Sequence, residues 1–389
     1  MVDSVKNLDR AVFRAPQTVQ DDVTNLVFQE TRKISGEGLA QPTYVQSEIV
    51  DPNGQAAKFT YDNRELTSTV ESEYTDVTPA RFNRAIHSDE SITDVTGVDI
   101  ASTATGFDSG ASNAFANLVV GDFFWSTGFV DTGLNIAHFI TAKADDNNVT
   151  VAVAPSSIEA AGPSVTIYSR KNTSGKERRY EVFQTRKLNT SLVGDLSYES
   201  LLNGATNTMG ITVEEGGIIK TSEAALYEKI IDGVAIIAGQ TDASKNTSSS
   251  YSARTNVKGY FVDGISELCQ FKTMDIQIDN GYEADNASGC SDKVLGKGPI
   301  SSTMTITARI PADDSDKWKL RSNNPDYNAS FAVLIASNDG LTEVIYAQDN
   351  SKLSEYAEPD GSKFIVGNIT ASGQCSVNQN TTITTYQNN

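Results

Sequence analysis

Short segments in which apolar and polar residues alternate recur along most of the chain. The clearest are Thr208–Val213, Thr273–Ile278 and Thr303–Ile310, where every second residue is apolar. An alternation with a period of two predicts a strand that buries one face. Segments rich in Gly, Asn, Asp and Ser separate these runs, and such residues favour turns. The pattern therefore predicts a mainly β protein built from many short strands.

Two of these segments are closely alike. Thr208–Val213 and Thr273–Ile278 both begin with Thr-Met, and each is followed by an acidic turn that contains glycine. We interpret the pair as an internal duplication of a strand–turn–strand unit. The alternative is that two amphipathic strands are alike by chance.

A few segments predict other local structures. Thr78 and Pro79 precede apolar residues that share one face, which predicts a helix of about two turns. Tyr198–Leu202 is interpreted as a helical turn, and Asp313–Leu320 as a short helix with acidic residues at its start. Asn338–Gly340 lies between two apolar runs and predicts a tight β-hairpin.

The stretch from His87 to about Ser169 differs from its surroundings. Candidate strands at Val119–Trp125, Ile136–Ala142 and Val149–Val153 follow one another across short turns. Such spacing is typical of a small barrel or sandwich. Because about eighty residues suffice for a separate module, we expect an inserted all-β module, immunoglobulin-like or SH3-like, at 89–169.

The net charge of the chain argues for some classes of function and against others. The 389 residues include 50 Asp and Glu against 31 Lys and Arg, which gives a formal net charge of −19. A surface that binds nucleic acid tightly needs clustered Lys and Arg, so this balance argues against such a protein. It suits a conduit through which nucleic acid passes, because like charges repel across a pore wall. Acidity that only keeps a concentrated protein soluble explains the balance equally well.

Residues that usually form catalytic or metal sites are sparse. The two histidines, His87 and His138, have no Ser or Cys partner in a known catalytic pattern, and neither a P-loop nor an HExxH motif is present. Asp145–Asn148 and Asp313–Asp316 supply oxygen atoms but lack the terminal Glu of an EF-hand loop. We therefore expect no enzyme activity, no cofactor and no bound metal.

The cysteines and the N-terminus bear on the compartment. Three widely spaced cysteines fit neither a disulfide framework nor a zinc site, and free thiols indicate a reducing compartment: Cys269, Cys290 and Cys375. The first residues lack the apolar core of a signal peptide. No apolar run approaches the ~18 residues that a membrane span needs, so we expect no membrane association.

The stretch from Arg178 to Leu226 resembles the siphophage tail tube proteins, which form the tails of long-tailed bacteriophages. In that family a strand and loop precede a glycine-containing turn, and an alternating strand, a second turn and a returning strand follow. Asn203–Ile219 has this order. Upstream, Thr69–Glu73 and Thr78–Arg84 look like the family's strand and the short Arg-containing segment that follows it.

The resemblance extends to domain organisation. The segment that contains Val120–Phe123 and Phe129–Val153 is similar to a β-module that some members have inside their first tube domain, and the region from Met274 onward looks like a second tube domain. The implied fold is mainly β, with two tandem sandwich- or barrel-forming tube domains, short helices and the inserted module. The implied division is an N-terminal arm at 1–45, a first tube domain at 46–88 and 170–232, the module at 89–169, a linker at 233–262 and a second tube domain at 263–389.

The resemblance also implies a function. Such a major tail protein is a structural virion component, located in the tail and assembled in the host cytoplasm. Two tube domains per chain imply homotrimeric, pseudo-hexameric rings that stack into the conduit for DNA ejection, without specific DNA binding. The tape-measure, tail terminator and distal tail proteins are the expected partners. The alternative hypothesis is a β-rich surface adhesin or carbohydrate-binding protein whose binding face comprises Phe123, Phe124 and Trp125.

The polar positions of the paired strands supply candidates for the wall of such a conduit. Glu214, Glu215, Asp275 and Asp279 are the acidic residues at or beside the alternating segments. They would face the lumen and repel the DNA backbone. An outward, solvated face is equally compatible with the alternation.

Overall fold

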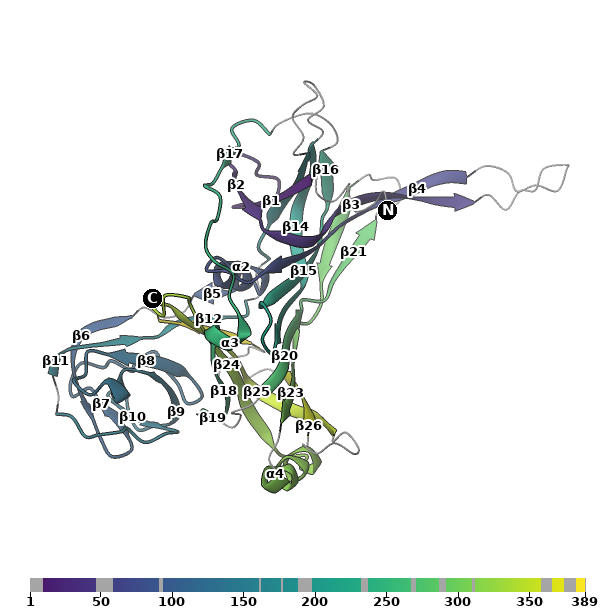
Figure 1. The fold of residues 1–389 in the computed structure, drawn as a ribbon. Helices are drawn as coiled ribbons and strands as arrows, with labels where there is room; N and C mark the ends of the chain where they lie inside the picture. The colour runs from purple at the N-terminus through teal and green to yellow at the C-terminus, as the bar shows by residue number, and fades with distance from the viewer. Residues whose placement is uncertain are drawn as a thin grey trace, which may run out of the picture.

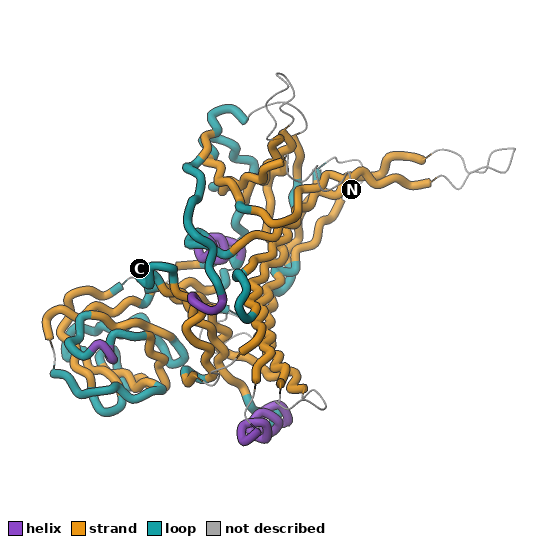
Figure 2. The backbone as a smooth tube through the Cα atoms, viewed as in Figure 1, coloured by secondary structure: helices purple, strands orange, loops and turns teal. Residues whose placement is uncertain are grey.

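Strands dominate the protein, and helices are few and short (Figure 2). The computed structural model describes residues 10–46, 59–90, 94–160, 162–175, 178–187, 198–231, 237–266, 271–286, 292–309, 312–357, 366–373 and 383–388. The prediction of a mainly β protein is confirmed. In Figure 1 a small barrel lies on one side of an elongated body, and a two-stranded arm projects from the other side.

The barrel is formed by residues between Val95 and Tyr168. Its six strands close in the order β10-β7-β6-β11-β8-β9. They are β6 (Val95–Ser102), β7 (Gly106–Asp108), β8 (Phe123–Thr127), β9 (Ala137–Lys143), β10 (Asn148–Val151) and β11 (Gly162–Tyr168), with the 3-10 turn η1 (Thr132–Leu134) between β8 and β9. Phe107, Phe115 and Phe124 fill its interior.

A long antiparallel sheet forms the spine of the body. Its strands lie in the order β3-β4-β15-β14-β20-β23-β26-β25. Their bounds are β3 (Lys33–Gln46), β4 (Phe59–Glu73), β14 (Tyr198–Glu214), β15 (Lys220–Leu226), β20 (Phe271–Asp279), β23 (Ser301–Arg309), β25 (Glu343–Ala357) and β26 (Val366–Gly373). Beyond the spine, β3 and β4 continue as the arm of Figure 1.

A second layer covers one face of this spine. The long strands β14 and β25 pass from the spine into the second layer, where each pairs with further strands. The elements of this layer are β1 (Arg10–Pro16), β2 (Val27–Thr31), β5 (Asp89–Glu90), β12 (Arg170–Thr173), β13 (Glu181–Lys187), β16 (Lys229–Ile231), β17 (Thr241–Asp242), β18 (Val257–Val262), β19 (Ile265–Ser266), β24 (Asn328–Ala336) and β27 (Thr384–Gln387). Two strands form a separate hairpin, β21 (Tyr282–Asn286) and β22 (Lys293–Lys297), and the helices are α2 (Thr78–Ala85), α3 (Ala253–Asn256) and α4 (Ala312–Asn323).

The body contains the same strand order twice. We call β1–β4, α2 and β13–β16 the first half, and β18–β20, β23–β27 and α4 the second half. The spine strands run β3-β4-β15-β14 in the first half and β20-β23-β26-β25 in the second. In the first half α2 follows the strand pair β3–β4, and in the second half α4 follows the strand pair β20–β23. The long strand that passes into the second layer, β14 or β25, pairs there with the strand that precedes it in the chain, β13 or β24.

Irregularities of register recur at matching places in the two halves. Three irregularities each occur once in each half. The first lies in the pair β3–β4 or β20–β23, the second where β14 or β25 pairs with β15 or β26, and the third where β14 or β25 pairs with β13 or β24. These paired positions are Lys33/Ser35 with Phe271/Thr273, Thr206/Thr208 with Leu353/Glu355, and Glu181/Phe183 with Ala329/Phe331. Because a bulge changes the bend and twist of a strand at one residue, three matched bulges align the halves residue by residue.

This alignment corrects the internal repeat expected from sequence. Thr208–Val213 and Thr273–Ile278 are not equivalent copies: they are neighbouring antiparallel strands, with Thr208 opposite Asp279 and Val213 opposite Met274. The equivalents are β14 with β25 and β20 with β3. The two segments look alike because each buries one face against the same core, in which Met209, Ile211, Ile276 and Ile278 pack together.

The structure confirms two of the local predictions and contradicts a third. The helix at Thr78 is confirmed as α2, although Val77 is its N-cap and the Thr78 hydroxyl accepts the Thr75 N–H instead. The hairpin at Asn338–Gly340 is confirmed, with Gly340 at φ 71°. The helical turn at Tyr198–Leu202 is wrong, because this segment pairs with both β13 and β16 as part of β14.

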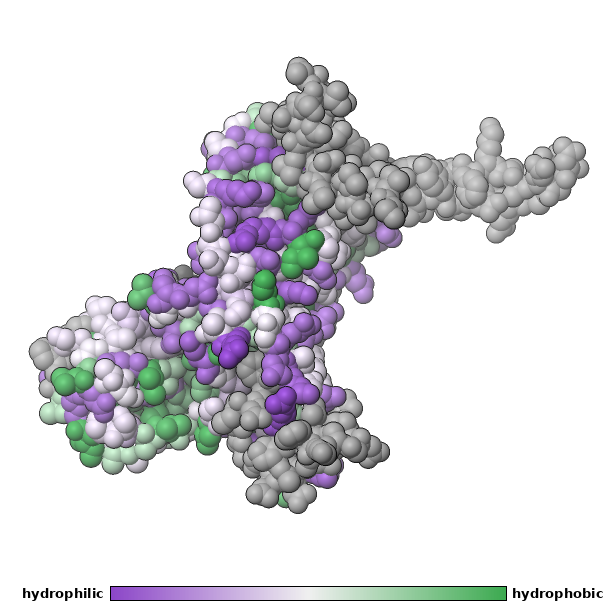
Figure 3. Space-filling model, viewed as in Figure 1, coloured by the Kyte–Doolittle hydropathy of each residue, from purple (hydrophilic) through white to green (hydrophobic). Residues whose placement is uncertain are grey.

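The boundaries expected at the N-terminus and linker also change. β1 and β2 belong to the body, because they pair with each other and β1 pairs with β13, whereas the end of β3 lies in the two-stranded arm. The segment treated as a linker packs along the first half, with Tyr251 buried beside Tyr74, and its end forms β18 of the second half. In Figure 3 the described surface of the body is largely hydrophilic, and hydrophobic residues gather on the barrel.

Candidate functional site

The face of the spine that points away from the core is polar and lacks a covering layer among the described residues. On β20, Met274, Ile276 and Ile278 are buried, while the residues between them are exposed. β23 repeats the pattern, with Met304 and Ile306 buried. Since the buried side of both strands is filled by α2, β18 and β24 residues, the exposed side is the free face of the sheet.

Acidic residues outnumber basic ones on this face. Its exposed acids are Glu65 and Glu71 on β4, Glu214 on β14, and Asp275 and Asp279 on β20. Among the side chains that the structure describes, two exposed basic residues share it, Lys220 and Arg309. The other positions are mostly Ser, Thr, Gln and Asn, so the face is hydrated and has excess negative charge.

Hydrogen bonds link side chains across the strands of this face. Thr212 Oγ1 donates to Asp275 Oδ1 at 2.9 Å, across the β14–β20 pair. Thr307 Oγ1 donates to Asn368 Oδ1 at 2.8 Å, across β23 and β26. Such cross-strand pairs stabilise a sheet by roughly 0.2–1 kcal/mol each, and they hold polar groups in fixed rows.

Three of the four acids expected from sequence lie on this face. Glu214, Asp275 and Asp279 are exposed at polar strand positions, and Asp279 also accepts the Gly281 N–H at 2.8 Å. Glu215 does not belong with them: it lies in the turn after β14, which Gly216 ends with φ 74°. Glu65 and Glu71 were not among the acids expected from the sequence. Their even spacing is the signal that could have found them, because residues an even number apart share one face of a strand.

Two edges of the spine have a partner on one side only within the described strands. β3 pairs with β4 alone, and the C-terminal part of β25, Glu355–Ala357, pairs with β26 alone. In β14 and β20, the equivalents of β25 and β3, the corresponding edges pair with each other. Edge strands expose N–H and C=O groups that can bind a further strand.

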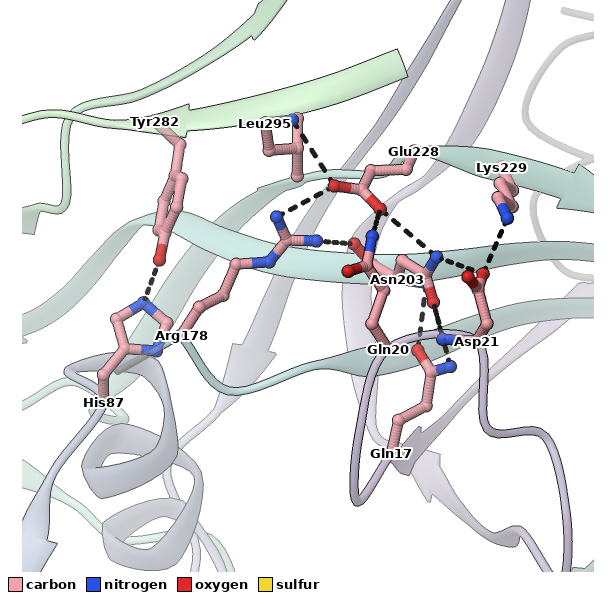
Figure 4. A network of polar contacts seen from close by, with 10 residues as sticks. All are labelled: Gln17, Gln20, Asp21, His87, Arg178, Asn203, Glu228, Lys229, Tyr282 and Leu295. Carbon is pink, nitrogen blue, oxygen red and sulfur yellow. Dashed lines mark hydrogen bonds and ion pairs between the residues drawn. The ribbon is translucent and has the colours of Figure 1, made fainter. Parts of the chain in front are cut away.

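A buried polar network fixes the two halves where they meet (Figure 4). Glu228 accepts Arg178 Nη1 at 2.9 Å and the Leu295 N–H of β22 at 3.4 Å. Arg178 Nη2 also donates to the Asn203 carbonyl at 2.8 Å. Asn203 has φ 54°, a conformation that Asn tolerates better than most residues. The network thus attaches the β21–β22 hairpin, which extends from β20 and β23, to the first half.

His87 belongs to the same junction. Its Nδ1 accepts the Arg179 N–H at 3.0 Å, so Nε2 carries the proton and lies 3.1 Å from the Tyr282 hydroxyl. Burial, together with the nearby cations of which Lys297 is the strongest, lowers the pKa of His87 to about 3. His87 is therefore a neutral structural residue at neutral pH, at the C-terminal end of α2.

His138 and Ser126 lie within hydrogen-bonding distance of each other in the barrel. Ser126 Oγ is 3.1 Å from His138 Nε2, but both groups also bond to the Leu134 carbonyl. An N–H that donates to a carbonyl cannot accept the serine proton. Burial lowers the pKa of His138 to about 4, and the bond to Leu134 opposes this shift. The pair does not have the arrangement of a nucleophile and its general base.

The aromatic binding face of the adhesin hypothesis is wrong. Phe124 lies in the barrel core, and Phe123 and Trp125 pack against the body beside Tyr386. All three are buried. Trp125 Nε1 donates to Glu343 Oε2 at 2.6 Å, and Lys171 pairs with Asp122 at 2.5 Å, so these residues attach the barrel to the second half.

Comparison with known proteins gives no family for the chain: no family model and no curated protein matches it. Within the described ranges, no cluster of three His, Cys, Asp or Glu residues is arranged to hold a metal. No helix in that part of the chain combines the length and apolar character needed to cross a membrane. Cys269, Cys290 and Cys375 lie outside the described residues.

Proposed function

We propose that the chain is a structural subunit of a hollow tube, the tail tube of a long-tailed bacteriophage. The observation that carries this proposal is the join between the halves. Within one chain, β14 of the first half pairs with β20 of the second half. The equivalent strands, β25 and β3, are the two open edges. Pairing β25 of one copy with β3 of the next repeats the internal join and extends the sheet.

The matched bulges define the register of this join between copies. Thr208 lies opposite Asp279 within the chain. Their equivalents across the bulges are Glu355 and Gln41. We therefore place Glu355 opposite Gln41 of the next copy, followed by Tyr356 opposite Ala40.

Closure follows from sheet curvature and symmetry. An antiparallel sheet that pairs its own edges around a ring becomes a barrel with no free edge. Two similar halves per chain give a trimeric ring with pseudo-six-fold symmetry, as the family resemblance implies, and rings stack into the tail. The tape-measure, terminator and distal tail proteins are then its partners, and its role is architectural rather than catalytic.

Only one face of the spine is covered by other elements, and this supports an orientation in which the uncovered face lines the bore of the tube. The apolar face is covered by the second layer and the helices, so only the acidic face is free to line the bore. A wall with Glu214, Asp275 and Asp279 repels duplex phosphates and lets DNA slide without adhering.

A disulfide experiment tests the join. In a background with the three native cysteines replaced by serine, Gln41→Cys with Glu355→Cys places two thiols directly opposite across the join. Facing residues of an antiparallel pair have Cβ atoms about 4.5–5.5 Å apart, close enough to oxidise with small adjustments. We expect covalent trimers on a denaturing gel and rings or tubes by negative-stain microscopy.

The matched control is Thr208→Cys with Asp279→Cys, which has the same register within one chain. It should oxidise without any increase in mass. A chain that stays monomeric at every concentration, with no rings, tubes or cross-links, contradicts the proposed function.

A further inference from the structure

The first half contains a cavity of about 500 Å³ that is open to solvent on one side. Its walls come from β1 and β2, the end of β4, and α2, and its floor contains Arg14, Glu181 and Glu223. The N-terminus of α2 opens onto this cavity without a side-chain cap. Neither the proposed tube wall nor the join between copies uses this cavity.

The floor is a buried charge cluster. Arg14 Nη1 contacts Glu223 and lies 3.3 Å from Glu181 Oε1. Arg81 Nη2 lies 2.5 Å from the second Glu223 oxygen. Thr206 donates to Glu223 at 2.9 Å, and the Tyr227 hydroxyl donates to Glu181 at 2.9 Å. The two carboxylates are thus well supplied with donors.

The groups that remain unsatisfied on this floor are donors. Arg14 has 8% of its side chain exposed, and its Nε and Nη2 atoms have no hydrogen-bond partner in the described part of the chain. The guanidinium also lies 5.3 Å from the centre of the Phe183 ring, which stabilises the charge but accepts no ordinary hydrogen bond. Buried donors without acceptors destabilise the folded state, so an acceptor in the cavity would stabilise them.

The second half of the same chain provides an internal comparison. The register alignment pairs four polar residues of the floor with apolar residues that occupy the same places in the second half. The pairs are Arg14 with Val262, Glu223 with Ile369, Glu181 with Ala329 and Thr206 with Leu353. All four apolar residues are buried.

This comparison tests whether the fold needs the charge cluster. The same topology forms around apolar residues, and replacing a buried ion pair by well-packed apolar residues is often neutral or stabilising. The fold therefore does not require the charged floor. A cavity and unsatisfied guanidinium donors occur together in the half that retains the charges.

We propose that this cavity is a binding site for a carboxylate group. Around the floor, Arg14, Arg81 and Arg84 face Glu181 and Glu223, so these five floor residues alone sum to one positive charge. One excess positive charge matches a singly charged carboxylate better than a doubly charged phosphate, and a guanidinium fork matches the two oxygens of a carboxylate. Nearer the mouth the lining adds Arg32 and three acids. Glu73 pairs with Arg32 at 3.2 Å, Glu30 lies 3.4 Å from Lys245, and Asp76 accepts Ser248 Oγ at 2.5 Å, so the positive excess belongs to the floor and not to the whole lining.

Two sources can supply this group: a free carboxylic acid, or an acidic side chain of another protein copy. The test uses N-acetylglutamate N-methylamide, whose only charge is its side-chain carboxylate, titrated into the unassembled chain by calorimetry at constant ionic strength. N-acetylglutamine N-methylamide is the neutral control probe, and inorganic phosphate tests the competing anion class. Acetate tests whether the carboxylate alone suffices.

The matched variant transfers the second-half residues into the first half: Arg14→Val, Glu181→Ala, Thr206→Leu and Glu223→Ile. This variant keeps residues that already pack in this topology, so we expect a cooperative unfolding transition like that of the wild type. A second variant, Arg14→Lys, keeps the charge and removes the fork. We expect the glutamate probe to bind the wild type, to bind Arg14→Lys about tenfold more weakly, and not to bind the four-residue variant.

The outcomes are distinct. Binding of the glutamate probe that disappears in assembled particles identifies a neighbouring copy as the source, and binding that persists there identifies a free acid. Equal binding of glutamine or stronger binding of phosphate contradicts the carboxylate assignment. Equal binding to the four-residue variant, or no binding of glutamate or acetate to folded wild type, overturns the site. The binding results with the unassembled chain do not depend on whether the chain forms tubes; only the assignment of the source uses assembled particles.

Discussion

Thr212 donates a hydrogen bond of 2.9 Å to Asp275 across the strand pair that joins the two halves. The two residues come from different halves of the repeated topology, yet they are directly opposite in one continuous sheet. This contact marks the internal copy of the join that we propose between subunits. It also places Asp275 in the middle of the free acidic face, where its charge is held in a fixed row.

The core beneath this join should be sensitive to truncation. Ile276 is fully buried and lies opposite both Ile211 and Met304. Ile276→Ala should lower the free energy of unfolding by about 3 kcal/mol, because it removes transfer energy and leaves a cavity. Urea denaturation measures this change. The neighbouring exposed residue is the control: Gln277→Ala should change stability by less than about 0.5 kcal/mol, and equal effects of both changes would contradict the one-sided burial.

The barrel should depend on one buried carboxylate for its attachment. Asp122 is fully buried, lies 2.5 Å from Lys171 Nζ and accepts the Tyr386 hydroxyl at 3.0 Å. Asp122→Asn should destabilise the protein by about 3 kcal/mol, because it removes the buried negative charge that lies 2.5 Å from Lys171 Nζ. Denaturant unfolding followed by barrel tryptophan fluorescence measures the loss. Asp146→Asn, which removes an exposed partner of Lys143, should cost less than about 0.5 kcal/mol.

Stability should fall when the pH drops below the ordinary pKa of histidine. Burial and the cations near His87 lower its pKa to about 3 in the folded protein, whereas the unfolded chain has the ordinary value of 6.5. Between these values the unfolded state binds more protons, so stability rises with pH and is lost on acidification. Each unit is worth at most about 1.4 kcal/mol for one group, so His87 should contribute a loss of about 2 kcal/mol between pH 6.5 and 5.

His87→Asn isolates this contribution. Asparagine tolerates the positive φ of 53° at this position, and it does not titrate in this range. Chemical denaturation of both proteins at pH 7 and 5 should give a smaller acid-induced loss in the variant. The remaining loss should come partly from His138, whose pKa burial lowers to about 4. An unchanged pH dependence would show that His87 is not buried neutral.

We expect substitutions in the charged floor to have strongly non-additive effects on the free energy of unfolding. Burial disfavours the Glu223 carboxylate, but Arg14 and Arg81 outweigh burial and lower its pKa to about 2. Arg14→Val alone should cost about 3 kcal/mol at pH 7, because it leaves part of a buried negative charge uncompensated. The double variant with Glu223→Ile should recover most of that loss, since this pair is the apolar pair of the second half. A double-mutant cycle by urea denaturation measures the coupling, and additive losses would contradict the internal comparison.

The local alternation of the chain determined much of the secondary structure. In Thr273–Ile278 and Thr303–Ala308 every second residue is apolar, and this alternation alone predicts which side chains are buried, because a strand directs successive residues to opposite faces. The same reasoning placed Glu214, Asp275 and Asp279 on the exposed side. Pro79 and Gly340 likewise marked a helix start and a tight turn, since both restrict or permit backbone angles locally.

Pairing partners were decided only in three dimensions. Thr208–Val213 and Thr273–Ile278 have the same pattern, but nothing local distinguishes a copy from a neighbour, because strand pairing joins residues far apart in sequence through backbone groups that every residue shares. For the same reason Tyr198–Leu202 became part of a strand once β13 and β16 lay on either side. The cluster of Arg14, Glu181 and Glu223 joins three distant segments, so sequence determined their charges and only the tertiary structure brought those charges together around a cavity.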